Sequence, residues 1–373
     1  MNSLAITYEG TEEICKEEIE EILNKKIEES LNKEEPSVVK FSSEKEELFK
    51  LAYLGQSFVN VIQLIDEFDI NEFEDIKKAK ESNYEEFEGK EFRVTCLRFG
   101  EHNFNSSDVE KEVGGYILDK IKSKVNCKVN LNNPEKVLYI YIYNNKCYIG
   151  IDYHNMDLSK RDYNVHSHSK GINSILGFCM LKLGKYSKGM VLLDPLCLSG
   201  TIPLEAGYYV TKFSINYFRK NKFLFVKQKL VDEQFFKNID TEFPKELQNI
   251  HAFDYEVKNI TASKHNAKIG EIDKVINFRK VETDWIDLKF EEESVDLICT
   301  APPTPNDRTL KLLKPRIREL FNNAEFVLKK GGRFVIKSNK LVEEMSKRTT
   351  LKLVEDKLIK KGKSSVCISV YEK

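Results

Sequence analysis

The stretch MVLLDPLCLSGTIPLEA at residues 190–206 joins an apolar run to a loop of small residues and then to a helical pattern. The apolar run, residues 190–194, predicts a buried strand that ends at Asp194. Backbone N–H groups at the start of the following helix suit an anionic group of a bound ligand. The stretch therefore predicts a ligand-binding loop in an α/β domain, although Leu198 occupies a position where such a tight loop favours glycine.

The sequence after this loop alternates strand patterns with helical patterns. Strands are expected at residues 190–194, 250–254, 274–280, 295–301 and 332–338, followed by a late pair at 350–359 and 364–373. Near-continuously apolar strands with crossover helices predict a doubly wound α/β domain with a mostly parallel sheet of seven strands. The connection between the last two strands is too short for a crossover, so the final strand is expected to be antiparallel.

The N-terminal half of the chain has a different organisation. Residues 1–60 show strand, amphipathic helix, strand and a further apolar helix, a pattern typical of a small ferredoxin-like unit. Residues 65–90 are acidic and predict a helical connector without a strong strand. A strand at 92–99 precedes a helix, and two alternating strands meet at Asn144 and Asn145, which indicates a β-hairpin.

Composition narrows the class of protein. The 373 residues carry 59 basic and 60 acidic side chains, so positive charge for nucleic-acid binding must be arranged locally. Eight cysteines are scattered without a CxxC pair, which argues against a zinc ribbon, and no metal site is predicted. No apolar run approaches the ~18 residues of a membrane span, and the N-terminus lacks the apolar core of a signal peptide. These features predict a soluble, reduced, cytoplasmic protein without a membrane partner.

Acidic residues recur where the predicted parallel strands end. Asp194, Asp254 and Asp284 follow the first three strands, and Ala301 begins the stretch APPTP after the fourth. Ligands of a doubly wound sheet bind at the carboxyl ends of its strands, and a carboxylate after the second strand suits ribose hydroxyls. The first loop lacks the GxGxxG that a pyrophosphate needs. Together with an antiparallel seventh strand, this favours an S-adenosylmethionine fold over a dinucleotide fold.

Several motifs resemble those of one known family. DPLCLSGTIPLEA is similar to the DPxCGSGTxxIEAA motif of THUMP-containing RNA methyltransferases, and ICTAPPTP at residues 298–305 stands where that family has (D/N)PPY. Upstream, FRVTCLRFGEHNFNSSDVEKEVG, VNLNNPEKVLYIYI and CYIGIDYHNMDLSKRDYNVH resemble successive parts of a THUMP domain and its exit into the catalytic half. The resemblance covers nearly the whole chain. Its length and layout are most similar to the branch that methylates the N2 amino group of guanosine in tRNA.

The resemblance implies a domain order, a cofactor and a partner. The implied domains are a ferredoxin-like domain at 1–62, a THUMP domain at 63–155, a linker and connecting helix at 156–188, and a Rossmann-fold methyltransferase domain at 189–373. The implied cofactor is S-adenosylmethionine, and the implied partner is RNA, in particular tRNA. The residues implied to bind the cofactor are Asp194, Pro195, Cys197, Ser199, Gly200, Thr201, Asp254, Tyr255, Asp284 and Trp285. Those implied at the catalytic motif are Ala301, Pro302, Pro303 and Thr304, and those implied to contact RNA are Arg98, Lys160, Arg161 and Lys170.

Three assignments stay open at the level of sequence. Either Asp254 or Glu256 can take the ribose hydroxyls of the cofactor. Trp285 suits a position in the core as well as one that stacks on adenine. The basic cluster RKNKFLFVKQK at 219–229, with its interleaved aromatic residues, suits RNA contact and a solvated surface equally.

Two departures from the family motifs bear on activity. Leu198 replaces the first glycine of the loop, where a left-handed backbone costs a leucine about 1–2 kcal/mol. Ala301 replaces the Asp or Asn that accepts a hydrogen bond from the target amino group, and Thr304 replaces the aromatic ring that stacks on the flipped base. Loss of one preorganised polar contact typically costs roughly 10²–10³ in rate.

Two hypotheses of different classes follow. The first is an S-adenosylmethionine-dependent tRNA guanine-N2 methyltransferase. The second is a non-catalytic RNA-binding protein that keeps the THUMP and Rossmann-like domains, for example as the partner of an active subunit. An open cleft at Leu198, with a side chain from 304–308 in front of Pro302, favours the first, whereas a cleft filled by Leu198 and Ile202 favours the second. A thiouridine synthase is excluded because the sequence has neither the required phosphate-binding loop nor paired catalytic cysteines.

Overall fold

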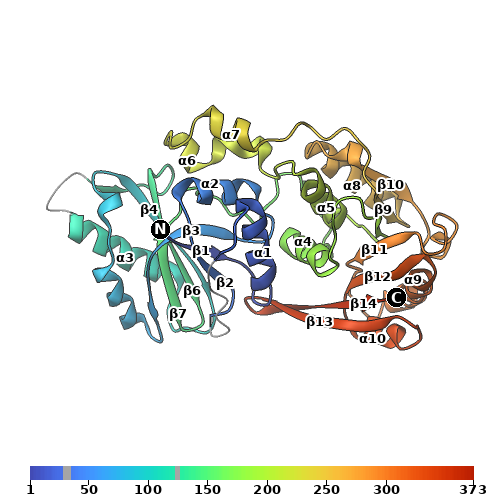
Figure 1. Cartoon of the computed structure of the whole chain (residues 1–373). Helices are drawn as coiled ribbons and strands as arrows, with labels where there is room; N and C mark the ends of the chain where they lie inside the picture. The colour runs from blue at the N-terminus through green and yellow to red at the C-terminus, as the bar shows by residue number, and fades with distance from the viewer. Residues whose placement is uncertain (28–34, 122–126) are drawn as a thin grey trace. The chain divides into compact units, whose positions relative to one another are not determined.

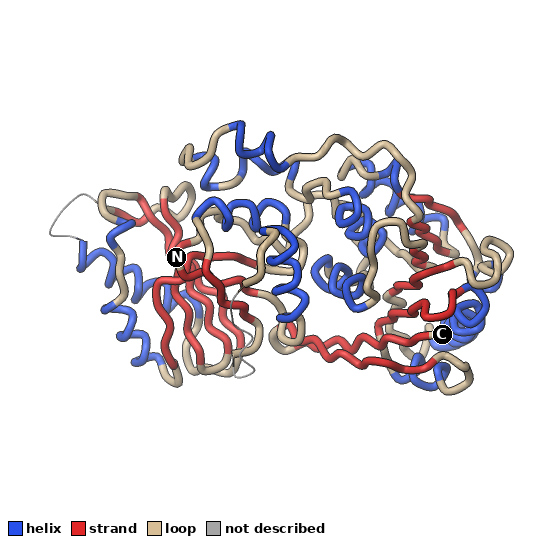
Figure 2. Tube along the Cα trace, viewed as in Figure 1, coloured by secondary structure: helices blue, strands red, loops and turns tan. Residues whose placement is uncertain are grey.

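The computed structural model describes residues 1–27, 35–121 and 127–373. The described chain divides into two compact units, each built on one seven-stranded sheet (Figure 1). The first unit comprises residues 1–158, 218–239 and 360–364, and the second comprises 159–217, 240–359 and 365–373. Figure 2 shows how strands and helices alternate along the trace, and the mixed α/β fold predicted from the sequence is confirmed.

The sheet of the first unit has the strand order β2-β1-β3-β7-β6-β4-β5. The elements of this unit are β1 (Asn2–Ile6), α1 (Glu12–Leu23), β2 (Val38–Ser42), α2 (Lys45–Leu54), β3 (Asn60–Asp69), 3-10 helices Phe73–Glu81 and Glu85–Phe87, β4 (Glu91–Phe99), α3 (Ser106–Ile121), β5 (Lys128–Val129), β6 (Lys136–Tyr143), β7 (Lys146–Ile151), α6 (Leu224–Lys227) and α7 (Glu233–Ile239). The predicted hairpin joins β6 to β7, and Asn144 takes the left-handed φ of 52° that the turn requires.

Strand β3 crosses the position of the predicted domain boundary and extends into the predicted connector. The predicted domain boundary after residue 62 falls inside β3, which pairs antiparallel with both β1 and β7. Strands of the predicted ferredoxin-like and THUMP domains therefore form one continuous sheet. The predicted helical connector at 65–90 begins as the second half of β3 and continues as the two 3-10 helices, because residues up to Asp69 complete the ladder with β7.

Residues 218–239 pack into the core of the first unit, although they follow α5 of the second unit in the chain. The backbone N–H of Phe225 donates to the carbonyl of Tyr153 at 2.8 Å, and the Phe225 ring stacks on Phe49 with centroids 4.5 Å apart. Phe223 is also fully buried. The aromatic residues of the basic cluster at 219–229 thus belong to the core, which leaves Lys222, Lys227 and Lys229 as its exposed cations.

The second unit has the strand order β10-β9-β8-β11-β12-β14-β13. Its elements are α4 (Ser174–Leu183), β8 (Leu192–Asp194), α5 (Thr201–Thr211), β9 (Ile250–Asp254), α8 (Val257–Ile269), 3-10 helix Asp273–Val275, β10 (Ile276–Lys280), 3-10 helix Thr283–Trp285, β11 (Val295–Thr300), α9 (Leu310–Val327), β12 (Leu328–Lys337), α10 (Lys340–Ser346), β13 (Lys352–Lys361) and β14 (Ser364–Glu372). Of the 3-10 helix Tyr217–Lys222, only Tyr217 belongs to this unit. Helix α4 packs against α5, so the predicted linker from residue 159 onward belongs to this unit.

The topology of the second sheet agrees with the sequence prediction. β8, β9, β10, β11 and β12 pair in parallel, and β14 pairs antiparallel with β12. β11, with the sequence VDLICT, lies between β8 and β12 and is buried almost throughout because both of its faces are covered. This arrangement brings the carboxyl ends of β8, β9 and β11 to one edge of the sheet. Within the described residues, no helix has the length and apolar character needed to cross a membrane.

Candidate functional site

The first side chain at this edge is Asp194, the last residue of β8. It is buried, and its Oδ1 accepts hydrogen bonds from the Thr300 hydroxyl at 2.7 Å and from the Leu196 N–H at 3.2 Å. Burial raises the pKa of the Asp194 carboxyl to about 8. The carboxyl therefore holds its proton at neutral pH, so it is a neutral group that ties β8 to β11.

The second side chain is Asp254, the last residue of β9, which is fully buried. Its Oδ2 accepts from the backbone N–H of Leu198 at 3.1 Å. Its Oδ1 accepts from the N–H of Glu256 at 2.9 Å and from Nδ2 of Asn259 at 3.0 Å. Burial raises the pKa of Asp254, while these three donors act in the opposite direction. The carboxylate thus joins the loops that follow β8 and β9.

The loop after β8 holds two residues in the left-handed region. Leu198 has a φ of 50° and Gly200 a φ of 87°. A Cβ atom on Gly200 would lie 2.2 Å from the Ser263 hydroxyl, so only glycine fits there. The backbone of Leu198 carries a strain of about 1–2 kcal/mol that a glycine would avoid. The Leu198 side chain is only 6% exposed.

The space beside this loop is small. A cavity of about 10 Å³ remains, and the residues that line it are Gly171, Ile172, Asp194, Leu196, Cys197, Leu198, Ser199, Thr201, Ile202 and Ala301. Such a cavity holds about one water molecule. Sites for small molecules typically measure roughly 300–1,000 Å³. Leu198 and Ile202 are both buried and both line this cavity.

The motif after β11 offers no side-chain acceptor at its first position. Ala301 is 4% exposed, Pro302 is buried, Pro303 is half-buried and Thr304 is exposed. Asn306 does not replace the missing acceptor, because its Oδ1 accepts from the N–H groups of Arg308 and Thr309 and from the Thr309 hydroxyl. Asn306 thereby holds the turn that leads into α9.

The residues predicted to lie near an adenine ring are partly accessible. Trp285 is 51% exposed and Asp284 is exposed, both on the short 3-10 helix after β10, so Trp285 is not a core residue. The ring of Tyr255 is half-buried, and the guanidinium carbon of Arg316 lies 4.0 Å from its centroid. Glu256, the alternative ribose ligand, forms an ion pair with Lys258 at 2.6 Å.

The other predicted loop residues, Pro195, Cys197, Ser199 and Thr201, are buried. The loop is fixed by Asn266, which the sequence reasoning missed. Its Nδ2 donates to the carbonyl of Ser199 at 3.0 Å and to that of His166 at 3.1 Å, and its Oδ1 accepts from the His166 N–H. A buried asparagine in a helix of otherwise polar surface gives no local signal of this role.

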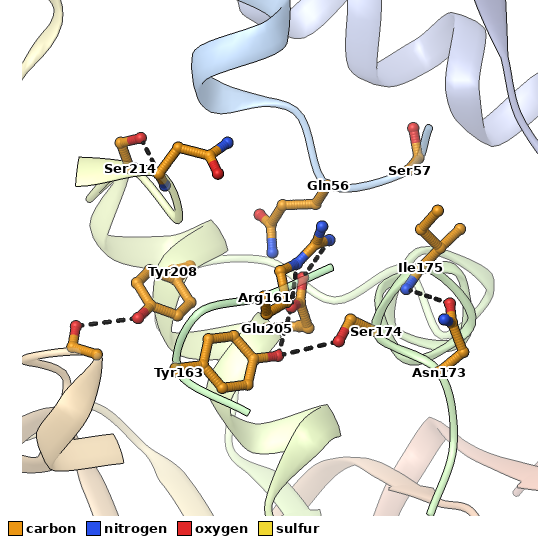
Figure 3. A network of polar contacts seen from close by, with 12 residues as sticks. Gln56, Ser57, Arg161, Tyr163, Asn173, Ser174, Ile175, Glu205, Tyr208 and Ser214 are labelled. Atoms are coloured by element: carbon orange, nitrogen blue, oxygen red, sulfur yellow. Dashed lines mark hydrogen bonds and ion pairs between the residues drawn. The ribbon is translucent and has the colours of Figure 1, made fainter. Parts of the chain in front are cut away.

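Arg161, predicted to contact RNA, lies in a buried ion pair (Figure 3). Its Nε donates to Oε1 of Glu205 at 2.9 Å and its Nη2 to Oε2 at 3.2 Å. The Tyr163 hydroxyl donates to the same Glu205 carboxylate at 2.6 Å. Arg161 of the KRDY stretch therefore has a structural role, because its ion pair with Glu205 connects the segment before α4 to α5. Glu205 is a second residue whose role the sequence reasoning missed.

The remaining residues predicted to contact RNA are distributed over both units. Lys160 and Lys170 are exposed. Arg98, at the end of β4, is half-buried, with its Nη1 2.7 Å from Nδ1 of His102 and its guanidinium over the Phe104 ring. Across the described residues, no cluster of side chains suits a metal ion.

Known proteins with similar sequences identify the family. A model of the RMKL-like methyltransferase domain matches residues 161–365, more than half of the chain, and a THUMP domain model matches 71–152. The chain belongs to the RMKL-like methyltransferase family. The tRNA (guanine(6)-N2)-methyltransferase of Methanocaldococcus jannaschii is 26% identical over 306 residues, which cover 79% of this chain and 80% of that protein. The tRNA (guanine(10)-N2)-dimethyltransferase of the same organism is 26% identical over 264 residues, covering 64% and 73%.

Solved structures agree with the fold. A possible methylase from Clostridium difficile 630 is 21% identical with a TM-score of 0.79, over 100% of this chain and 97% of that one. The putative methyltransferase SMU.472, solved with S-adenosylhomocysteine, is 17% identical with a TM-score of 0.77, over 100% and 97%. The Rossmann-like methyltransferase fold is thereby confirmed. The family implies S-adenosylmethionine as the cofactor, as the sequence predicted.

The residues at this site fit that cofactor only in part. Asp194 and Asp254 end β8 and β9 at the edge of the sheet where ligands of such folds bind, and Gly200 has a left-handed φ. However, Leu198 is buried in the loop, the cavity holds about one water molecule, and the Asp194 carboxyl is neutral near pH 7. The space beside the loop, about 10 Å³, is far smaller than a site for a molecule of the size of S-adenosylmethionine.

Proposed function

We propose that this chain is an RNA-binding protein of the RMKL-like methyltransferase family, with tRNA as its ligand, in which methyl transfer is suppressed. The observation that carries this proposal is the side chain of Ala301. A methyl group cannot accept a hydrogen bond from a target amino group, and Asn306 is committed to the turn before α9. The step that orients the nucleophile in this family therefore has no side chain to perform it.

The RNA ligand is supported by the THUMP domain match and by the names of the relatives, which act on tRNA. The chain carries nearly equal numbers of acidic and basic side chains, so binding depends on local cations rather than on overall charge. Lys160 and Lys170 are exposed on the segment that leads into α4 and are the cations that we assign to phosphate contacts. Arg98, which lies beside His102 and Phe104, is a further RNA contact from the THUMP region.

A second candidate function is the transfer of a methyl group from S-adenosylmethionine to N2 of a guanosine in tRNA. It is favoured by the two strand-end acids, Asp194 and Asp254, and by the 26% identical relative. In this case the backbone carbonyl of Pro302 alone would receive the amino group. The rate would then fall by roughly 10²–10³ or more for each hydrogen bond that the altered motif no longer makes.

One experiment separates the two functions. The purified protein is incubated with unmodified tRNA transcripts and methyl-labelled S-adenosylmethionine, and the same tRNA is tested for a gel shift. We expect a shift and no transferred label. Label recovered in N2-methylguanosine after nuclease digestion would overturn the proposal and establish the second function. A positive control, the triple variant Leu198→Gly, Ala301→Asn and Thr304→Tyr, restores both family motifs and shows whether the assay can detect activity on this scaffold.

A further inference from the structure

We infer that Leu198 is the residue that excludes an adenosyl ligand from this site, and that glycine at this position restores binding of S-adenosylhomocysteine. The inference rests on the cofactor that the family implies and deepens the proposed function. It differs from the argument on Ala301, because Ala301 bears on the transfer step and Leu198 on ligand binding alone.

The backbone of the loop is already arranged for a ligand. Leu198 adopts a φ of 50°, which glycine takes without strain. Its N–H donates to Asp254 in a bond that does not depend on the side chain. Replacing the leucine by glycine therefore removes the side chain and leaves the path of the loop unchanged. It also removes a strained residue, which partly offsets the loss of buried apolar surface.

The other large side chains around the cavity are held elsewhere. Ile202 is directed at α4, because a Cβ atom on Gly177 would lie 3.6 Å from its Cγ1. Leu196 belongs to the apolar cluster that contains Leu193 and Phe253. Leu198 is therefore the lining residue whose side chain can be removed without opening the core of the sheet.

The carboxylate of Asp254 is largely used by structural hydrogen bonds. A carboxylate has about four acceptor positions, and the Leu198, Glu256 and Asn259 donors use three of them. These three donors leave one acceptor position, although the carboxylate is fully buried in this structure. Trp285, exposed at the end of the neighbouring strand, offers a ring face to the adenine of the same ligand. The inference therefore assigns the ribose to Asp254 and the adenine to Trp285 once the Leu198 side chain is removed.

The test is calorimetric titration with S-adenosylhomocysteine, which needs no turnover. The full-length protein is compared with Leu198→Gly, Leu198→Ala and the control Lys212→Gly, which changes another left-handed residue that does not line the cavity. We expect no heat for the natural sequence at millimolar ligand and affinity tighter by at least roughly 100-fold for Leu198→Gly, equivalent to two tenfold steps of about 1.4 kcal/mol each. Leu198→Ala falls between them, and Lys212→Gly behaves like the natural sequence.

Two outcomes would overturn the inference. One is a Leu198→Gly protein that melts cooperatively and still gives no heat of binding. If Leu198→Gly does not fold, the same outcome in a folded Leu198→Ala protein would overturn the inference. The other is binding by the natural sequence as tight as that of Leu198→Gly. Adding Asp254→Asn to Leu198→Gly should remove the gained affinity. The proposed function is tested separately by methyl transfer to tRNA. If Leu198→Gly binds S-adenosylhomocysteine and also methylates tRNA, the inference on Leu198 stands and the argument on Ala301 fails.

Discussion

The carboxylate of Asp254 accepts the backbone N–H of Leu198 across 3.1 Å, so the acid that ends β9 holds the loop that follows β8. The same carboxylate also receives the N–H of Glu256 and the amide of Asn259. Asp254 is therefore a structural residue as well as a candidate cofactor-binding residue. Replacing Asp254 should therefore lower the stability of the protein even when no cofactor is bound.

Asp254→Ala should lower the free energy of unfolding by at least about 2 kcal/mol, because buried donors left without a partner cost about 1–3 kcal/mol each. Urea denaturation measures this difference. Asp284→Ala, at an exposed strand-end acid, is the control and should change stability by no more than about 0.5 kcal/mol. Equal effects at the two positions would show that the Asp254 bonds do not stabilise the loop.

Asp194→Asn should change the pH dependence of stability. The pKa of Asp194 is raised to about 8 by burial, from an ordinary value of 3.8, so the folded state binds more protons than the unfolded state between these values. Stability should therefore fall as pH rises from about 4 to 8, by up to about 1.4 kcal/mol per pH unit. Asparagine stays neutral and keeps an acceptor for Thr300, so the variant should lose this slope. Parallel melting curves of the two proteins from pH 5 to pH 8 would contradict a buried neutral carboxyl.

Glu205→Ala should cost about 3–5 kcal/mol, because it leaves the Arg161 guanidinium buried without its carboxylate. The double variant Arg161→Met with Glu205→Leu should lose much less, since buried pairs can often be replaced by apolar residues of similar size. Thermal melts of the single and double variants give the comparison. If the double variant were the less stable of the two, the pair would be a source of net stability.

Phe225→Ala should destabilise the first unit by about 3–5 kcal/mol, because its ring is fully buried against Phe49. Phe218 lies near the start of the same segment but is 56% exposed, so Phe218→Ala should have little effect. Amide hydrogen exchange in α2 reports whether the loss reaches the element that Phe225 covers. Unchanged protection of α2 in Phe225→Ala would mean that residues 218–239 are not part of this core.

Lys160→Ala and Lys170→Ala should each weaken tRNA binding and reduce the slope of log affinity against log salt by about 0.7–0.9. Lys311→Ala, at an exposed cation on α9, is the matched control. Filter binding at several salt concentrations gives the slopes. A slope that is unchanged in both variants would remove these lysines from the interface.

The local pattern of the sequence predicted the second unit well. Apolar strands such as β11 are evident from their own residues, and the short connection between the last two strands dictates that β14 is antiparallel. The hairpin at Asn144 is equally local. The local pattern of a sequence does not show which strand pairs with which. The pairing of β3 with β7 was therefore not predicted, and the boundary placed after residue 62 divided a single sheet.

The candidate site was predictable only in part: the strand-end acids were predicted, and the contacts between distant segments were not. The rule that ligands bind at strand ends located Asp194 and Asp254, because topology alone brings them together. The buried ion pair of Arg161 with Glu205 was not predictable, since a basic stretch before a helix looks the same whether its cation faces solvent or another helix. The role of Asn266 depends on a loop 67 residues away in the sequence and was missed for this reason.

Residues 218–239 belong to the first unit although they follow part of the second unit in the chain. This arrangement affects the order in which the two units can fold during translation. Domains generally fold as units as they leave the ribosome, N-terminal part first. Here the opening 158 residues emerge without the aromatic residues that cover α2, which follow only after the first strand and helix of the other sheet. The nascent first half therefore keeps an uncovered apolar face for a time, and a chaperone that shields such surface would act on it during translation. The two halves are expected to mature together rather than one after the other.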